Sequence, residues 1–189
     1  SASKSVKTGK VPDVTTANLW VSARNWSGIN CTVTWKTNTS FQIQVSNTPT
    51  VENSWKTQNS LAVETCHTTY ARLFDGTNHS NYASDTPVLK YTVTYNGNGS
   101  TSGSTANSSH DYGTDKKLTA NGFTKTGHTF KNWNTKADGT GTSYSNQQTV
   151  KNLSSTNGST VTLYAQWTVN KYTFTLGSGT GVSTTGSSG

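Results

Sequence analysis

The chain has 189 residues and a formal net charge of +7, and 29% of its residues are hydrophobic while 12% are charged. A composition so poor in Leu and Ile excludes one large core and long amphipathic helices. Yet 6 Trp, 8 Tyr and 5 Phe are too many aromatic residues for a disordered chain. We therefore expect small β-domains, each built on a few aromatic anchors, and no apolar run is long enough for membrane insertion.

The positive charge is spread along the chain as single lysines, and Lys116-Lys117 is the one adjacent pair. Binding to a phosphate backbone favours a clustered, Arg-rich stripe with interleaved aromatic residues. The sequence therefore argues against a nucleic-acid partner. Solvated lysines that protect strand edges explain the pattern more simply, and weak attraction to anionic polymers at a cell surface is a second interpretation.

Residues 1–12 combine spaced lysines with small residues and Pro12, which predicts a linker or N-terminal arm. Short alternating runs then follow over residues 13–89, as in Phe41, Ile43 and Val45, which are separated by single Gln residues. This period of two places the apolar side chains on one face of a strand. Strands at roughly ten-residue spacing predict an Ig-like β-sandwich over 13–89.

Two strings in this region carry a resemblance. FQIQVSNTPTVENSW and TTYARLFDGTNHSNYAS are similar to the bacterial Ig-like or fibronectin-III-like modules of large secreted proteins. In those modules a hairpin that ends in Trp precedes an aromatic strand and turn, and Tyr70, Arg72, Asp75 and Gly76 match that pattern.

Residues 90–168 have a different sequence pattern, in which the predicted strand KYTVTY is followed by a long polar stretch. Residues 127–168 contain G-x-x-F-x-x-W and L-Y-A-x-W, and this segment resembles the Listeria–Bacteroides repeat family, also called the internalin B-repeat. The matching positions are Gly127, Phe130, Trp133, Gly139, Gly141, Tyr144, Val150, Leu153, Val161, Leu163, Tyr164, Ala165, Trp167 and Thr168. The resemblance implies a compact, β-dominated unit related to the β-grasp fold.

An internal repeat indicates a tandem array. The string Lys90–Thr94 (KYTVT) recurs as Lys171–Thr175 (KYTFT). One strand cannot bury a face alone, so residues 169–189 are interpreted as the start of a further, incomplete repeat. The predicted fold class is thus all-β, with an Ig-like sandwich followed by a β-grasp-like B-repeat in a modular array.

The two cysteines, Cys31 and Cys66, are candidates for a disulfide, since such positions can face each other across a sandwich. Two buried free thiols are one alternative, and a nucleophilic Cys66 beside His67 is another. The second is weakened because neighbours on a strand point to opposite faces.

No catalytic, metal or cofactor motif is present, and the His and carboxylate residues are dispersed. We therefore predict no enzyme, no metal site and no cofactor.

The aromatic residues have two candidate roles. In a domain with few aliphatic residues, rings must serve as core, and the predicted core anchors are Trp35, Trp55, Tyr70, Phe130, Trp133, Tyr144, Tyr164 and Trp167. Trp20 and Trp26 lie in a polar neighbourhood and are candidates for surface residues that stack on a sugar or contact a partner, with core burial as the favoured alternative.

Together these patterns predict a non-enzymatic, extracellular modular surface protein of a bacterium, either an adhesin-type stalk or a binding repeat. Its partner would be a protein or glycan at a cell surface. The alternative is a subunit of an extracellular filament or phage tail appendage, whose termini pair with neighbouring copies. A third hypothesis is a carbohydrate-binding module.

Overall fold

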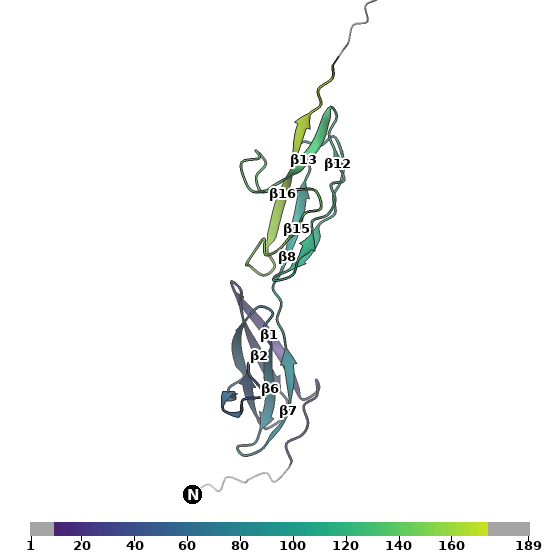
Figure 1. Ribbon diagram of the computed structural model, residues 1–189. Helices are drawn as coiled ribbons and strands as arrows, with labels where there is room; N and C mark the ends of the chain where they lie inside the picture. Colours follow the sequence, from purple (N-terminus) through teal and green to yellow (C-terminus); the bar gives the residue numbers. More distant parts are fainter. Residues whose placement is uncertain (1–9, 174–189) are drawn as a thin grey trace, which may run out of the picture.

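The structure, a computed structural model, describes residues 10–173. Its regular elements are strands apart from one 3-10 turn, η1 (Glu52–Ser54), within this range. This confirms the predicted all-β class. In Figure 1 two groups of strands follow one another end to end, and we call residues 10–89 the N-terminal part and residues 90–173 the C-terminal part.

The N-terminal part consists of two antiparallel sheets. One has the order β1-β2-β5 and the other the order β4-β3-β6-β7. The strands are β1 (Leu19–Ser27), β2 (Asn30–Thr37), β3 (Gln42–Ser46), β4 (Lys56–Thr57), β5 (Ser60–Glu64), β6 (Thr69–Phe74) and β7 (His79–Asp85). Both sheets contribute to one core, so they pack face to face, although the Ig-like or fibronectin-III-like assignment stays a prediction.

Alternating side chains explain how these sheets share a core. In β2, Cys31, Val33 and Trp35 are buried while the residues between them are more exposed, as a period of two requires. From the other sheet, Val45 and Leu73 are fully buried in the same cluster. A β-bulge between Val21 and Ala23 shifts the register of β1 against β2 and bends that edge strand.

The C-terminal part is organised around a five-stranded sheet of order β10-β8-β16-β13-β14. The long strand β16 pairs in parallel with β8 and antiparallel with β13. Two further sheets of two strands each pair β11 with β15 and β12 with β9. The strands are β8 (Lys90–Asn96), β9 (Ser102–Gly103), β10 (Ser108–Asp111), β11 (Lys116–Lys117), β12 (Phe123–Thr124), β13 (His128–Asn134), β14 (Ser143–Tyr144), β15 (Thr149–Val150) and β16 (Thr160–Val169).

An aromatic cluster fills the core of the C-terminal part. Trp133 is fully buried, and its ring centroid lies 4.8 Å from that of Tyr95 and 5.0 Å from that of Phe130. Phe130 also packs edge-on against Trp167 at 5.8 Å. These rings share the core with buried aliphatic side chains such as Leu118 and Leu163, and they supply much of the apolar volume in a chain that is poor in Leu and Ile.

The two parts meet at a junction that is bonded on several sides. The Cys66 amide donates to the Pro87 carbonyl at 2.8 Å, and the Tyr112 amide donates to the Leu89 carbonyl at 2.8 Å. Trp26 packs against the cores of both parts. The connecting segment is thus covered by side chains and hydrogen bonds from each part.

Candidate functional site

The predicted core anchors occupy a range of environments. Trp35 and Trp133 are almost completely buried, and Trp55 is 9% exposed. The others are half-buried; these are Tyr70, Phe130, Tyr144, Tyr164 and Trp167. The Trp167 indole N–H donates to the Gly97 carbonyl at 2.9 Å, so this ring is fixed at its polar end as well as by its face.

Trp20 and Trp26, the candidate binding residues, are both half-buried. They lie near opposite ends of β1 and do not form one surface. Trp26 is partly covered by both cores, which gives it a packing role at the junction. Its local sequence is polar, and its partial burial results from packing against both the core of its own part and that of the distant C-terminal part.

The disulfide prediction is wrong in this structure, since Cys31 and Cys66 are both free. Cys31 points into the core from β2, where burial raises the pKa of its thiol. Cys66 lies in a turn with φ of 65° and is exposed. Its Sγ donates instead to the Tyr112 carbonyl at 3.3 Å, so the second thiol is directed to the junction.

The outer face of the β4-β3-β6-β7 sheet carries a cluster of aromatic and charged groups. The guanidinium of Arg72 lies 4.1 Å from the centre of the Trp55 ring, a cation–π arrangement. It also donates to Glu52 at 2.6 Å and to Gln44 at 2.9 Å, and the hydrogen bond from Arg72 lowers the pKa of Glu52. The buried Arg72 guanidinium therefore has a carboxylate, an amide oxygen and an aromatic ring as partners.

Tyr82 extends this cluster to the surface. Its ring contacts Tyr70 edge-on at 5.3 Å and Trp55 at 6.1 Å, and 49% of its surface is exposed. The sequence analysis missed Tyr82, although Tyr70 and Arg72 stand two residues apart on β6 and so share one face. That spacing was the available signal for an aromatic face here.

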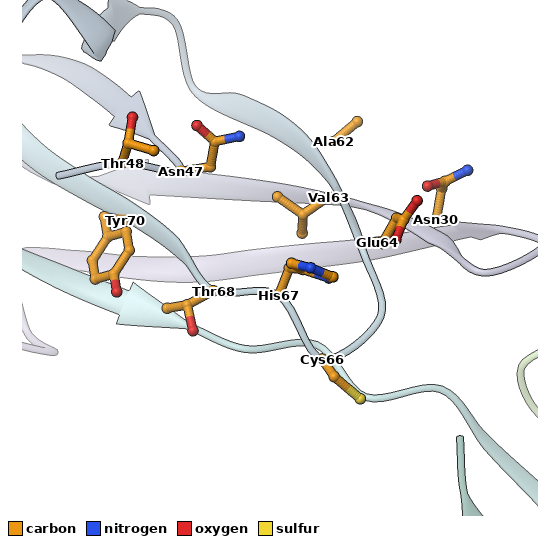
Figure 2. Close-up of a pocket in the computed structure, with 10 residues that line it drawn as sticks. All are labelled: Asn30, Asn47, Thr48, Ala62, Val63, Glu64, Cys66, His67, Thr68 and Tyr70. Atoms are coloured by element: carbon orange, nitrogen blue, oxygen red, sulfur yellow. The ribbon is translucent and has the colours of Figure 1, made fainter. Parts of the chain in front are cut away.

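Beside this face lies a groove with a volume of about 660 Å³. Its walls come from the end of β3, from β5 and from the β5–β6 turn, as Figure 2 shows. The lining combines apolar surface with amide, hydroxyl, carboxylate and imidazole groups, which come from residues far apart in the sequence: Asn30, Asn47, Thr48, Glu64, His67 and Tyr70. We refer to this site as the groove.

Other kinds of site find no support among the described residues. Between residues 10 and 173 no group of three or more His, Cys, Asp or Glu could hold a metal ion. No helix in that range is long and apolar enough to cross a membrane. Asp138 lies in a turn, where its carboxylate accepts a hydrogen bond from the Thr140 amide at 2.9 Å.

The fold and these surfaces define an all-β protein built from structural units in series. Residues 91–166 match the family model of the Listeria-Bacteroides repeat domain, which confirms the resemblance seen in this part of the sequence. This is a bacterial extracellular repeat family whose domain is a non-catalytic surface repeat. No curated protein and no solved structure matches the chain.

Proposed function

We propose that this chain is part of an extracellular, non-enzymatic surface protein of a bacterium, in which it acts as a spacer of the adhesin-stalk type. The repeat family supports the location. The single observation that carries the spacer role is the bonded junction, because a stalk must keep its units at a fixed angle. Units joined by a flexible linker would instead move independently.

The junction supports this role through groups from both parts. Leu89, which precedes β8, is fully buried, and its amide donates to the Thr65 hydroxyl at 2.8 Å. On the other side, the Lys90 amide donates to the Asn157 side chain at 2.9 Å. The backbone at Leu89 and Lys90 is therefore hydrogen-bonded on both sides of the junction, which leaves little rotational freedom between the two parts.

Residual dipolar couplings test this proposal directly. A rigid spacer gives one alignment tensor that fits the amides of both parts. A matched variant with Gly-Ser-Gly-Ser inserted after Pro87 should give two tensors of different magnitude. Two independent tensors in the unaltered chain would overturn the spacer role.

The filament-subunit alternative depends on termini that pair with neighbouring copies. Those termini, residues 1–9 and 174–189, lie outside the described residues. Size-exclusion chromatography with light scattering separates the two hypotheses. A constant mass of 20.2 kDa over a concentration series supports the spacer, and growth into rods or fibres supports the filament subunit.

A further inference from the structure

Several polar side chains that line the groove, most of them exposed to solvent, have no hydrogen-bond partner among the described residues. The side chains of Asn30, Asn47 and Glu64 make no hydrogen bond or ion pair within residues 10–173. The same holds for the hydroxyls of Thr48 and Tyr70. By contrast, buried Asn134 in the C-terminal part bonds to several loop groups. The groove therefore offers several donors and acceptors to a ligand.

An ordered aromatic wall stands beside these groups. Tyr70 lines the groove, and its ring meets Tyr82 at an interplanar angle of 87°. Tyr82 in turn contacts Trp55, which is stacked on Arg72. Because each ring is held by the next, the exposed surface of Tyr82 is preorganised, and binding would cost little side-chain entropy.

The charge of the lining excludes several ligand classes. The groove contains the Glu64 carboxylate and no Lys or Arg, so phosphate and sulfate groups would meet no cation. Residues 10–89 as a whole carry five basic and five acidic side chains, which gives no electrostatic attraction for a polyanion. The apolar lining residues are Ala62 and Val63, too few for a lipid or an apolar cofactor.

We propose that the groove binds a neutral oligosaccharide. A sugar ring presents a C–H face that can pack on an aromatic side chain, here Tyr70 and Tyr82. Its hydroxyls both donate and accept, which matches the amides of Asn30 and Asn47 and the carboxylate of Glu64. The volume of about 660 Å³ lies within the range of ligand pockets, roughly 300–1,000 Å³. This activity goes beyond the spacer role and is independent of it.

Titrations followed by amide NMR of the full chain test this binding. The probes are three neutral trisaccharides, namely N-acetylated chitotriose (called chitotriose below), maltotriose and cellotriose, together with N-acetyllactosamine. We expect saturable shifts confined to amides near residues 30, 46–48, 62–70 and 82 with at least one probe. Chitotriose represents the N-acetylated glycans of cell walls, and N-acetyllactosamine represents the glycans of host cell surfaces. Binding of either supports the proposal.

Two variants with matched controls then assign the contacts. Tyr82→Ala and Asn47→Ala should each weaken binding about tenfold, as the loss of one good contact predicts. Tyr172→Ala removes a tyrosine that is 73% exposed, and Asn107→Ala removes an exposed amide in the C-terminal part; both should leave affinity unchanged. Unaltered amide spectra away from the substitution show that each variant is folded.

Three results would overturn the proposal. The first is the absence of shifts with all four probes, together with no signal on an array of neutral glycans. The second is binding that is restricted to sulfated or sialylated saccharides and is lost at high salt. Such binding would depend on surface lysines, and the groove contains none. The third is an equal loss of affinity in Tyr82→Ala and Tyr172→Ala.

Discussion

The backbone amide of Leu89 donates a hydrogen bond to the side-chain hydroxyl of Thr65, at 2.8 Å, where the two parts of the chain meet. Both residues are buried, since Leu89 is fully buried and Thr65 is 6% exposed. Leu89 is the last residue of the N-terminal part but packs in the core of the C-terminal part, whereas Thr65 follows β5 of the N-terminal part. One hydrogen bond thus fixes the point where the chain passes from one unit to the next.

Replacing this hydroxyl should loosen the junction. Thr65→Val keeps the shape of the side chain but leaves the buried Leu89 amide without a partner, which costs about 1–3 kcal/mol. We expect hydrogen exchange at the Leu89 amide to accelerate, with strand amides far from the junction unchanged. Thr50→Val, at an exposed position, is the control. Unchanged protection of Leu89 in Thr65→Val would show that the bond does not hold the junction.

Trp133 should dominate the stability of the C-terminal part. Its buried ring contacts Tyr95, Phe130 and Phe123, so Trp133→Ala leaves a large cavity. We expect the free energy of unfolding to fall by about 3–5 kcal/mol, as measured by urea denaturation. Tyr172→Ala, an exposed aromatic position, should change it by less than about 0.5 kcal/mol. An equal loss of unfolding free energy in Trp133→Ala and Tyr172→Ala would contradict the prediction that Trp133 dominates the stability of this part.

Asn134 should control the order of the loop that follows β13. Its side-chain oxygen accepts from the amides of Lys136 and Gly141, at 2.9 and 3.0 Å, and its amide group donates to the Gly139 carbonyl at 3.1 Å. With the side chain 1% exposed, Asn134→Ala should destabilise the C-terminal part by about 2 kcal/mol. Hydrogen exchange should accelerate over residues 136–141. If Asn107→Ala accelerates exchange over residues 136–141 to the same extent, Asn134 does not control the order of this loop.

The stability of the C-terminal part should depend on His110 in mild acid. Burial lowers the pKa of His110, and the nearby charge of Lys116 lowers it further. As the pH falls below the unfolded value of about 6.5, the unfolded chain binds the proton first, so the free energy of unfolding decreases. His110→Phe keeps a ring against Tyr91 and should flatten this decrease in urea titrations between pH 7 and 5. His128→Gln should retain it, and a slope that survives in His110→Phe would contradict the assignment.

The sequence predicted features that depend on local periodicity. The alternation of Phe41, Ile43 and Val45 correctly indicated a strand, β3, whose apolar side chains pack against one core, and the repeat motif indicated the C-terminal unit. Features made by distant segments were not predictable in this way. Trp26 is half-buried because the cores of both parts pack against it, and the groove combines residues from positions 30 to 70.

The thiols provide the last prediction, because the structure and the sequence differ there. With Cys31 buried and Cys66 exposed, a thiol reagent should modify one cysteine quickly in the folded chain. The second should react only in urea, since burial raises the pKa of the Cys31 thiol and blocks access to it.

Cys66→Ser is the control for this measurement and should abolish the fast reaction while leaving the slow one. Reductant should not change the unfolding midpoint, because no covalent loop constrains the unfolded chain. The contrary result is no reactive thiol in urea without reductant and two after reduction. That result would show that the oxidised protein joins Cys31 to Cys66, which requires the β5–β6 turn to leave its contact with the Tyr112 carbonyl.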